Sequence, residues 1–174
     1  MDLKEYIRSI PDYPKKGILF RDITTLIKNE KAFEETVNQI IERSKKYKVD
    51  KIAAIESRGF VFASAVSYLL KKPFIMLRKK NKLPADVHSV DFELEYGTAT
   101  IEVHKDSINE KDNVLIIDDL IATGGTAEAA AKLVEISKGK VAAFIFVINL
   151  FDLGGCEKLQ KNFKVENLIE FPGH

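Results

Sequence analysis

The sequence predicts an α/β domain in which helices flank a parallel sheet. Three apolar runs, at 52–55, 114–117 and 141–148, carry this prediction, and none alternates cleanly between apolar and polar residues. Continuous apolar runs are typical of strands that helices cover on both faces. Helix-like segments separate the runs, and strands that alternate with helices form parallel sheets with right-handed crossovers. At 174 residues, the chain is long enough for one domain with a full hydrophobic core.

The remaining elements follow from local signals along the chain. Residues 2–10 are expected to form a short amphipathic helix, which the proline-containing turn at 11–14 ends. Asn29 has the side chain of an N-cap, and the helix after it presents an apolar face of Phe33, Val37, Ile40, Ile41 and Tyr47. Helices are expected at 60–70 and 126–137, the second ending at Gly139, with a further strand at 73–77.

Residues 90–104 break the strand–helix alternation. Two strand-like segments flank Tyr96-Gly97, and residues 100–104 alternate between polar and apolar side chains. This pattern predicts a β-hairpin that leaves the main sheet and has one face in water. In a compact domain such an excursion often serves as a lid over a binding site.

Composition excludes several classes of protein. A formal net charge of +1 gives no global attraction to nucleic acid or to anionic membranes, so neither is an expected partner. Cys156 is the only cysteine, which excludes an internal disulfide and fits a reducing compartment. The acidic N-terminus does not resemble a signal peptide, and the longest apolar run is far shorter than the ~20 residues of a membrane span. We therefore expect a cytoplasmic protein.

The segment 114–126 is the most informative part of the sequence. Its apolar strand is followed by Asp118 and Asp119 and then by the small-residue loop Ala122–Thr126. Carboxylates accept hydrogen bonds from a ribose diol, and a loop without bulky side chains lets backbone N–H groups surround a phosphate at a helix N-terminus. Acid pairs also cap helices and Gly-Gly pairs also form ordinary turns, but this order of features favours a phosphoribosyl ligand. The sequence has neither a P-loop nor a dinucleotide-binding glycine motif.

This segment resembles the diphosphate-sugar motif of the type I phosphoribosyltransferases. Four other segments, 18–23, 56–60, 78–84 and 94–97, resemble the adenine-specific members of that family and occur in the same order. The resemblance implies the type I phosphoribosyltransferase fold as a single domain over residues 1–174. It also implies a small N-terminal hood at about 1–28 and a lid hairpin at about 86–104.

The resemblance assigns the sugar-phosphate part of the site. It implies that the phosphoribosyl group is bound by Asp118, Asp119, Ala122, Thr123, Gly124, Gly125 and Thr126. It implies pyrophosphate binding by Ser57, Arg58, Arg78 and Tyr96, with a cis peptide bond at Glu56–Ser57. A surface ion pair is the alternative for Arg58, and the lysines after Arg78 are expected to be a solvated face. Family members often have Asp or Ala where this chain has Glu56, a departure that is not expected to matter if backbone groups bind the pyrophosphate.

The base-binding residues are also carried over from the resemblance. It implies adenine binding by Leu19, Phe20, Arg21 and Leu150, with the Phe20 ring stacked on the purine. Without the resemblance, Leu19 and Phe20 would be interpreted as core residues. Glu95 is implied to act as a general acid/base near the purine imidazole ring, although a glutamate before Tyr-Gly is also compatible with an ordinary hairpin tip.

The reaction that the resemblance implies is magnesium-dependent transfer of 5-phosphoribose. The donor would be 5-phosphoribosyl 1-pyrophosphate, the acceptor N9 of adenine, and the products AMP and pyrophosphate. Asp118, Asp119 and Glu95 are the expected catalytic residues, and Mg²⁺ is expected to bind through substrate and water, without direct protein ligands. The family usually forms homodimers, and an exposed apolar face on the N-terminal helix would be consistent with one.

Two alternatives remain at this point. A related transferase would use hypoxanthine, guanine, xanthine or orotate, but those enzymes do not share the segments around Phe20 and Glu95. A non-catalytic sensor of phosphoribosyl pyrophosphate would normally carry an added DNA-binding segment with a basic face. The length of the chain and its net charge of +1 leave no room for such a segment.

Overall fold

The structure of the chain, a computed structural model, describes residues 1–94 and 96–174. Its main sheet has seven strands in the order β5-β6-β4-β3-β7-β8-β9. Five of them run parallel to one another: β3 (Lys51–Ile55), β4 (Phe74–Lys79), β7 (Asn113–Ile121), β8 (Lys140–Leu150) and β9 (Val165–Phe171). The predicted α/β class with a parallel sheet flanked by helices is therefore confirmed.

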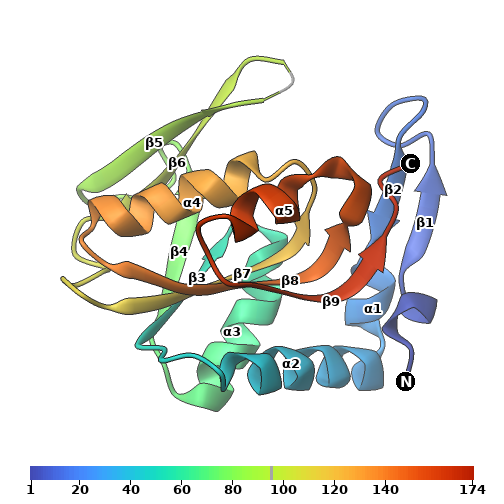
Figure 1. The fold of residues 1–174 in the computed structure, drawn as a ribbon, viewed down its shortest axis with the longest axis horizontal. Helices are drawn as coiled ribbons and strands as arrows, with labels where there is room; N and C mark the ends of the chain where they lie inside the picture. The colour runs from blue at the N-terminus through green and yellow to red at the C-terminus, as the bar shows by residue number, and fades with distance from the viewer. Residues whose placement is uncertain (95) are drawn as a thin grey trace.

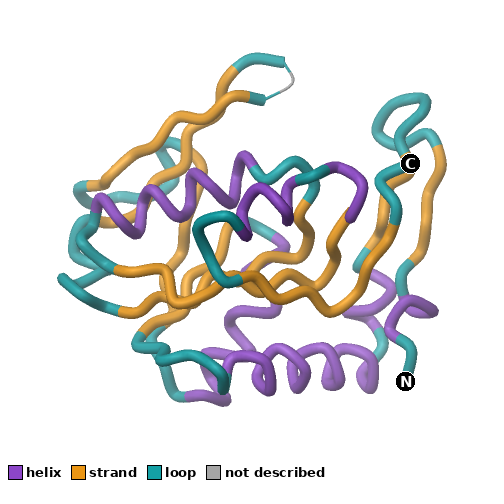
Figure 2. Tube along the Cα trace, viewed as in Figure 1, coloured by secondary structure: helices purple, strands orange, loops and turns teal. Residues whose placement is uncertain are grey.

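Helices cover both faces of this sheet (Figure 1). α2 (Glu30–Ser44) and α3 (Arg58–Leu70) pack on one face, and α4 (Gly125–Ile136) and α5 (Gly155–Gln160) lie on the other. Figure 2 shows the strands passing between these two helical layers. Two 3₁₀ turns, η1 (Leu3–Tyr6) and η2 (Phe151–Leu153), and the short α1 (Thr24–Lys28) complete the helical segments described. None of the helices within residues 1–94 and 96–174 combines the length and apolarity that crossing a membrane requires.

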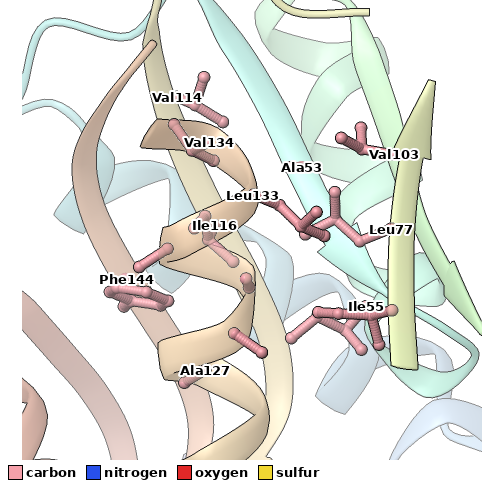
Figure 3. Close-up of a cluster of buried hydrophobic side chains, with 14 of the residues drawn as sticks. Ala53, Ile55, Leu77, Val103, Val114, Ile116, Ala127, Leu133, Val134 and Phe144 are labelled. Carbon is pink, nitrogen blue, oxygen red and sulfur yellow. The ribbon is translucent and has the colours of Figure 1, made fainter. Parts of the chain in front are cut away.

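The central strands are apolar on both faces because each face contacts its own hydrophobic cluster. Ile116, Leu133 and Phe144 come together between the sheet and α4 (Figure 3). Leu115 and Phe62 belong to the cluster on the opposite face, beneath α2 and α3. Neighbouring residues of a strand point to opposite faces, so a strand covered twice has no polar positions. Full burial of one such large side chain contributes about 1.5–3 kcal/mol.

The predicted hairpin is present as β5 (Val87–Glu93) and β6 (Thr98–His104). It does not leave the main sheet as expected, because β6 pairs with β4 at Arg78 and Lys79. The buried carboxylate of Glu102 strengthens this junction by accepting hydrogen bonds from Ser89 Oγ and from the Asn81 backbone N–H. The base of the hairpin is thus part of the sheet, while its tip extends beyond it (Figure 1).

The predicted N-terminal helix over residues 2–10 is wrong. Only the 3₁₀ turn η1 forms there, and the chain then enters β1 (Arg8–Pro11), which pairs antiparallel with β2 (Leu19–Asp22) in a separate two-stranded sheet. The pairing is reinforced by Arg8, whose guanidinium donates to the carboxylate of Asp22 at 2.5 Å and 3.1 Å. Cross-strand pairing has therefore overridden a weak helical periodicity.

Helix boundaries follow the predicted capping chemistry, with one exception. Asn29 accepts a hydrogen bond from the Ala32 N–H at 3.0 Å, as predicted for an N-cap. At the end of α4, the left-handed residue is Lys138 (φ 67°) and not the expected Gly139. Gly139 instead has a packing role, because a Cβ there would lie 2.7 Å from Ile108 Cγ2.

Candidate active site

A pocket of about 370 Å³ lies at the carboxyl ends of the parallel strands. Three segments that are far apart in the sequence meet there: the turn from β3 to α3, the end of β4, and the passage from β7 into α4. Ligands of open parallel sheets bind at this edge. The lining residues are Ile55, Glu56, Ser57, Arg58, Lys79, Asp118, Asp119, Leu120, Ile121, Ala122, Thr123, Gly124, Gly125, Thr126, Ala127 and Phe146.

The turn between β3 and α3 brings Ser57 and Arg58 to the pocket. The Glu56–Ser57 peptide bond is cis, as expected. The next glycine, Gly59, is a point of close approach, because a Cβ there would lie 2.9 Å from Asp118 Oδ1 and 3.1 Å from the Ile117 carbonyl oxygen. The start of α3 therefore packs directly against the acidic end of β7.

The two acids belong to β7 itself, which continues to Ile121 and does not end before them as the sequence suggested. Asp119 is buried and accepts a hydrogen bond at 2.6 Å from Arg58 Nε. Burial raises the pKa of Asp118 well above its ordinary value, and the neighbouring Asp119 carboxylate raises it further. The sequence left two roles open for Arg58, a surface ion pair or a place in the pyrophosphate site. In the structure Arg58 forms an ion pair with Asp119 and also lines the pocket. A positive group entering the pocket would stabilise the ionised form of Asp118.

The loop Ala122–Thr126 leads directly into α4, and all five of its residues line the pocket. Gly124 adopts a left-handed conformation (φ 89°), which a residue with a Cβ rarely takes. Helix α4 begins at Gly125, so the free N–H groups and the positive end of its dipole lie at the pocket. This arrangement suits a phosphate.

The end of β4 differs from the expectation. Of the two basic residues there, Lys79 lines the pocket, whereas Arg78 is absent from the described lining. The Arg78 guanidinium lies 3.5 Å from Glu56 Oε2, and its buried Nε has no hydrogen-bond partner among the described residues. Glu56 also accepts a hydrogen bond from the Lys79 backbone N–H, so its carboxylate ties the end of β4 to the pocket turn. The interpretation of Lys79 as part of a solvated face is therefore incomplete.

Of the expected base-binding residues, the structure places Phe20 next to a residue that lines the pocket. The Arg58 guanidinium lies 5.8 Å from the centre of the half-buried Phe20 ring, within the range of a cation–π contact. The Tyr13 ring meets Phe20 edge-on at 5.1 Å. Leu19 is half-buried in β2, and Leu150 is buried at the end of β8. None of these residues is among the described pocket-lining residues.

The Arg21 side chain links β2 to the C-terminal segment. Its guanidinium donates to Ser9 Oγ at 2.6 Å and to the Pro172 carbonyl oxygen at 3.0 Å. It also lies over the ring of Phe171, 4.5 Å from the ring centre. The Arg21 side chain therefore anchors β2 to the C-terminal segment.

The tip of the β5–β6 hairpin is only partly described. Glu95, the expected general acid/base, lies outside the described residues. Tyr96 is 77% exposed, and Lys15 Nζ lies 5.0 Å from the centre of its ring. Lys15 is in the loop between β1 and β2, so the hairpin tip and this loop meet through a cation–π contact.

The oxygen donors in the pocket are of the kind that Mg²⁺ prefers. No group of three Asp, Glu, His or Cys side chains that could hold a metal gathers among residues 1–94 and 96–174. Mg²⁺ often binds through one or two carboxylates, water and substrate phosphates. The carboxylates of Asp118 and Asp119, beside a phosphate-binding loop, fit an ion held mainly by its substrate.

Known proteins are similar to this chain in both sequence and fold. The family described as the phosphoribosyl transferase domain matches residues 23–171. The chain belongs to the phosphoribosyltransferase family. An adenine phosphoribosyltransferase of Pelagibacter ubique is 82% identical to it, with 100% of both chains covered.

Solved structures extend this similarity to the backbone of these phosphoribosyltransferases. The adenine phosphoribosyltransferase of Thermoanaerobacter pseudethanolicus is 46% identical, with a TM-score of 0.94 over 98% of each chain. That of Saccharomyces cerevisiae, complexed with an imino-altritol bisphosphate and adenine, is 36% identical, with a TM-score of 0.90 over 96% of each chain. The resemblance inferred from the sequence is therefore confirmed.

Proposed function

We propose that the chain transfers 5-phosphoribose from 5-phosphoribosyl 1-pyrophosphate to N9 of adenine, forming AMP and pyrophosphate in purine salvage. This proposal depends on one observation: Asp118, Asp119, Arg58 and the loop Ala122–Thr126 line the same pocket. The identity of the base is supported by full-length relatives that are adenine phosphoribosyltransferases.

The sugar-phosphate half of the substrate would occupy the passage from β7 into α4. The loop Ala122–Thr126 and the N-terminus of α4 supply backbone donors for the 5-phosphate. Asp118 and Asp119 accept hydrogen bonds from the ribose hydroxyls. Arg58 would have to exchange its contact with Asp119 for the pyrophosphate, since both partners compete for the same guanidinium.

In the reaction, N9 of adenine forms a bond to C1 of the ribose as the bond from C1 to the pyrophosphate oxygen breaks. Positive charge develops on the ribose ring while the leaving pyrophosphate gains negative charge. The fixed carboxylates of Asp118 and Asp119 stabilise the first charge, and Arg58 stabilises the second. Mg²⁺, when bound to the substrate oxygens, supplies further charge neutralisation for the leaving group.

The base would lie beside the sugar, between β2 and the end of β8. The Phe20 ring stacks on the purine, Leu19 and Arg21 present backbone groups to its edge, and Leu150 closes the other face. Support comes from the position of Phe20 next to Arg58, which itself lines the pocket. Glu95 exchanges a proton with the purine imidazole ring, a role that rests on the sequence resemblance alone.

Two moving parts complete the proposed site. Tyr96 and the β5–β6 hairpin form a lid that covers the pyrophosphate side and keeps water from the developing cation. Arg78, held by Glu56 in this structure, joins the pyrophosphate when the substrate binds. The contact between Lys15 and Tyr96 supports a closed arrangement in which the lid meets the hood of residues 1–28.

We also propose a homodimer in the cytoplasm. The apolar face once expected on an N-terminal helix does not exist, because residues 2–10 form a 3₁₀ turn and a strand. A different surface supports the dimer: Val61, Tyr68 and Leu69 of α3 and Met76 of β4 are all exposed. α3 and β4 contact each other, and a group of exposed apolar side chains often marks a protein interface. The single cysteine fits a reducing compartment.

The test is direct. The protein is incubated with Mg²⁺, 5-phosphoribosyl 1-pyrophosphate and one base at a time, and nucleotide formation is measured for adenine, hypoxanthine, guanine, xanthine and orotate. We expect AMP from adenine and little or no product from the other bases. Product from another base at a comparable rate would overturn the base assignment. Binding of the pyrophosphate donor without any product would favour the sensor.

A further inference from the structure

We propose that two residues of the short passage from β8 into α5, Asp152 and Gly155, position the two halves of the site. Gly155 fixes the shape of the phosphate loop, and Asp152 holds the C-terminal segment that anchors β2. Neither residue is among the described pocket-lining residues, so both act through others. The inference rests on the proposed function, which decides what each half of the site binds.

Gly155 packs against the backbone of the phosphate loop without space for a side chain. A Cβ there would lie 2.4 Å from the Ala122 carbonyl oxygen and 2.7 Å from both the Gly124 nitrogen and the Thr123 carbonyl carbon. These atoms belong to backbone, so they cannot move aside as a flexible side chain would. The Gly155 N–H also donates to the Ala122 carbonyl oxygen at 3.2 Å.

The contact is reciprocal. A Cβ on Gly124 would lie 3.1 Å from both the Cα and the carbonyl oxygen of Gly155. The loop and the passage into α5 therefore meet through two glycine backbones. Any group added at Gly155 must displace the loop, whose N–H groups are aimed at the phosphate. Displacement of a binding group by about 1 Å can cost a factor of ~10² in rate.

The other end of the passage into α5 holds the C-terminal segment. Asp152 Oδ1 accepts a hydrogen bond from the Gly173 N–H at 2.6 Å. A Cβ on Gly173 would lie 2.6 Å from Leu153 Cγ, so the segment is packed against η2 as well as bonded to it. The preceding residue, Pro172, accepts the hydrogen bond from Arg21 that anchors β2.

These contacts connect two separate parts of the site through one short element. On one side the contact runs from Gly155 to the loop at Ala122–Gly124. On the other it runs from Asp152 through Gly173 and Pro172 to Arg21. Because the two sets share no residue, a change in each should affect one substrate only. That separation distinguishes positioning from a general loss of stability.

The experiment measures KM for each substrate separately, in Gly155→Ala, Asp152→Ala and Asp152→Asn. In Gly155→Ala we expect KM for phosphoribosyl pyrophosphate to rise about tenfold or more, with KM for adenine within about twofold. In Asp152→Ala we expect KM for adenine to rise about threefold to tenfold, with the other KM unchanged. Asp152→Asn keeps an accepting oxygen and should restore most of the affinity for adenine.

Gly154→Ala is the matched control. Gly154 has a left-handed backbone (φ 79°) but no atom within 4 Å of the position of an added Cβ. The control should lower Tm without changing either KM more than about twofold. A thermal shift with ribose 5-phosphate gives a readout that does not depend on transfer: Gly155→Ala should lose the stabilisation seen in the wild type.

The outcomes separate this inference from the proposed function. If the wild type forms no AMP, the proposed function fails. If the wild type forms AMP but Gly155→Ala and Asp152→Ala change both KM values equally, or change Tm alone, the positioning role is overturned. A rise in KM for phosphoribosyl pyrophosphate in Gly154→Ala equal to that in Gly155→Ala would also overturn it.

Discussion

The phosphate side of the pocket is formed by consecutive residues, 118–126, on a central strand and the helix after it, whereas the proposed base side combines three distant segments. Those segments are β2, the end of β8, and the C-terminal residues 171–172. The phosphate side is fixed by the main sheet, with a buried acid and a loop packed against Gly155. The base side is held by a few side chains such as Arg21, several of them partly exposed.

This difference in construction matches what each substrate needs from the site. The developing ribose cation needs charges that are already in place, which a rigid sheet edge supplies. A planar base needs mainly a stacking surface and a few edge contacts, which side chains and backbone groups from several segments can supply together. Loss of a charged group that faces the ribose cation should therefore reduce kcat, while loss of the surface on which the base stacks should raise KM for adenine.

The largest expected effect tests whether proton transfer on the base side limits the rate. Glu95→Ala should lower kcat by ~10²–10⁴ if Glu95 is a general acid/base, and Glu95→Gln should do the same. Steady-state rates across pH measure this directly, since a titrating Glu95 leaves a limb in the wild-type profile that both variants lose. A loss below about threefold would reduce Glu95 to a packing role in the hairpin.

The acids of the phosphate side come next. Asp118→Asn and Asp119→Asn should each lower kcat by ~10²–10³, because a neutral amide cannot stabilise the ribose cation. KM for adenine should stay nearly constant, which single-substrate titrations would show. Circular dichroism of each variant serves as the control for folding. An unchanged kcat would remove the substituted acid from the mechanism.

A smaller effect, confined to KM, is expected for Phe20 on the base side. Phe20→Ala should raise KM for adenine about 5- to 150-fold, which corresponds to the ~1–3 kcal/mol that stacking of a base on an aromatic ring contributes. Phe20→Tyr keeps the ring and should stay close to the wild type. An equal rise in KM for phosphoribosyl pyrophosphate would instead indicate that Phe20 acts through Arg58, whose guanidinium lies 5.8 Å away.

The same contrast explains what the sequence could predict. The strand, the acids and the loop at 114–126 could be predicted because their residue types and their order along the chain indicate a phosphoribosyl ligand. The parallel arrangement of the main strands was predicted from strand–helix alternation, and the N-cap at Asn29 was predicted from residue type. The antiparallel pairing of β1 with β2 did not follow, because its stabilising contact joins Arg8 to Asp22, 14 positions away.

The pair Arg78 and Lys79 shows a second limit. Successive residues of a strand point to opposite faces, so the side chains of Arg78 and Lys79 lie in different surroundings. A sequence does not state where a strand twists or ends, and Arg78 was expected at the pocket because of the family resemblance. The structure brings Lys79 to the pocket and leaves Arg78 against Glu56. The packing role of Gly155 could not be predicted from the sequence, because its contact with Ala122 depends on how two loops meet in space.

The smallest expected effect concerns stability in the absence of substrate. Burial and the nearby Asp119 raise the pKa of Asp118, so the folded protein holds a proton that the unfolded chain has already lost. The contribution of Asp118 to stability therefore falls as pH rises from the ordinary carboxyl pKa to the raised one, and stays low above it. Asp118→Asn cannot titrate and should unfold at a higher temperature than the wild type at neutral pH.

Differential scanning calorimetry of both proteins across pH measures this gap. In a domain of this size, each kcal/mol moves Tm by about 2–4 °C. The gap should close near the ordinary carboxyl pKa, where Asp118 is protonated in both states. A variant no more stable than the wild type at neutral pH would show that Arg58 already offsets the charge of the pair. Suppose that Asp118→Asn loses much of its kcat and that its Tm exceeds that of the wild type by more at higher pH. The charge of Asp118 would then lower the stability of the folded protein while it supports catalysis, as expected for a charge that is in place before the substrate binds.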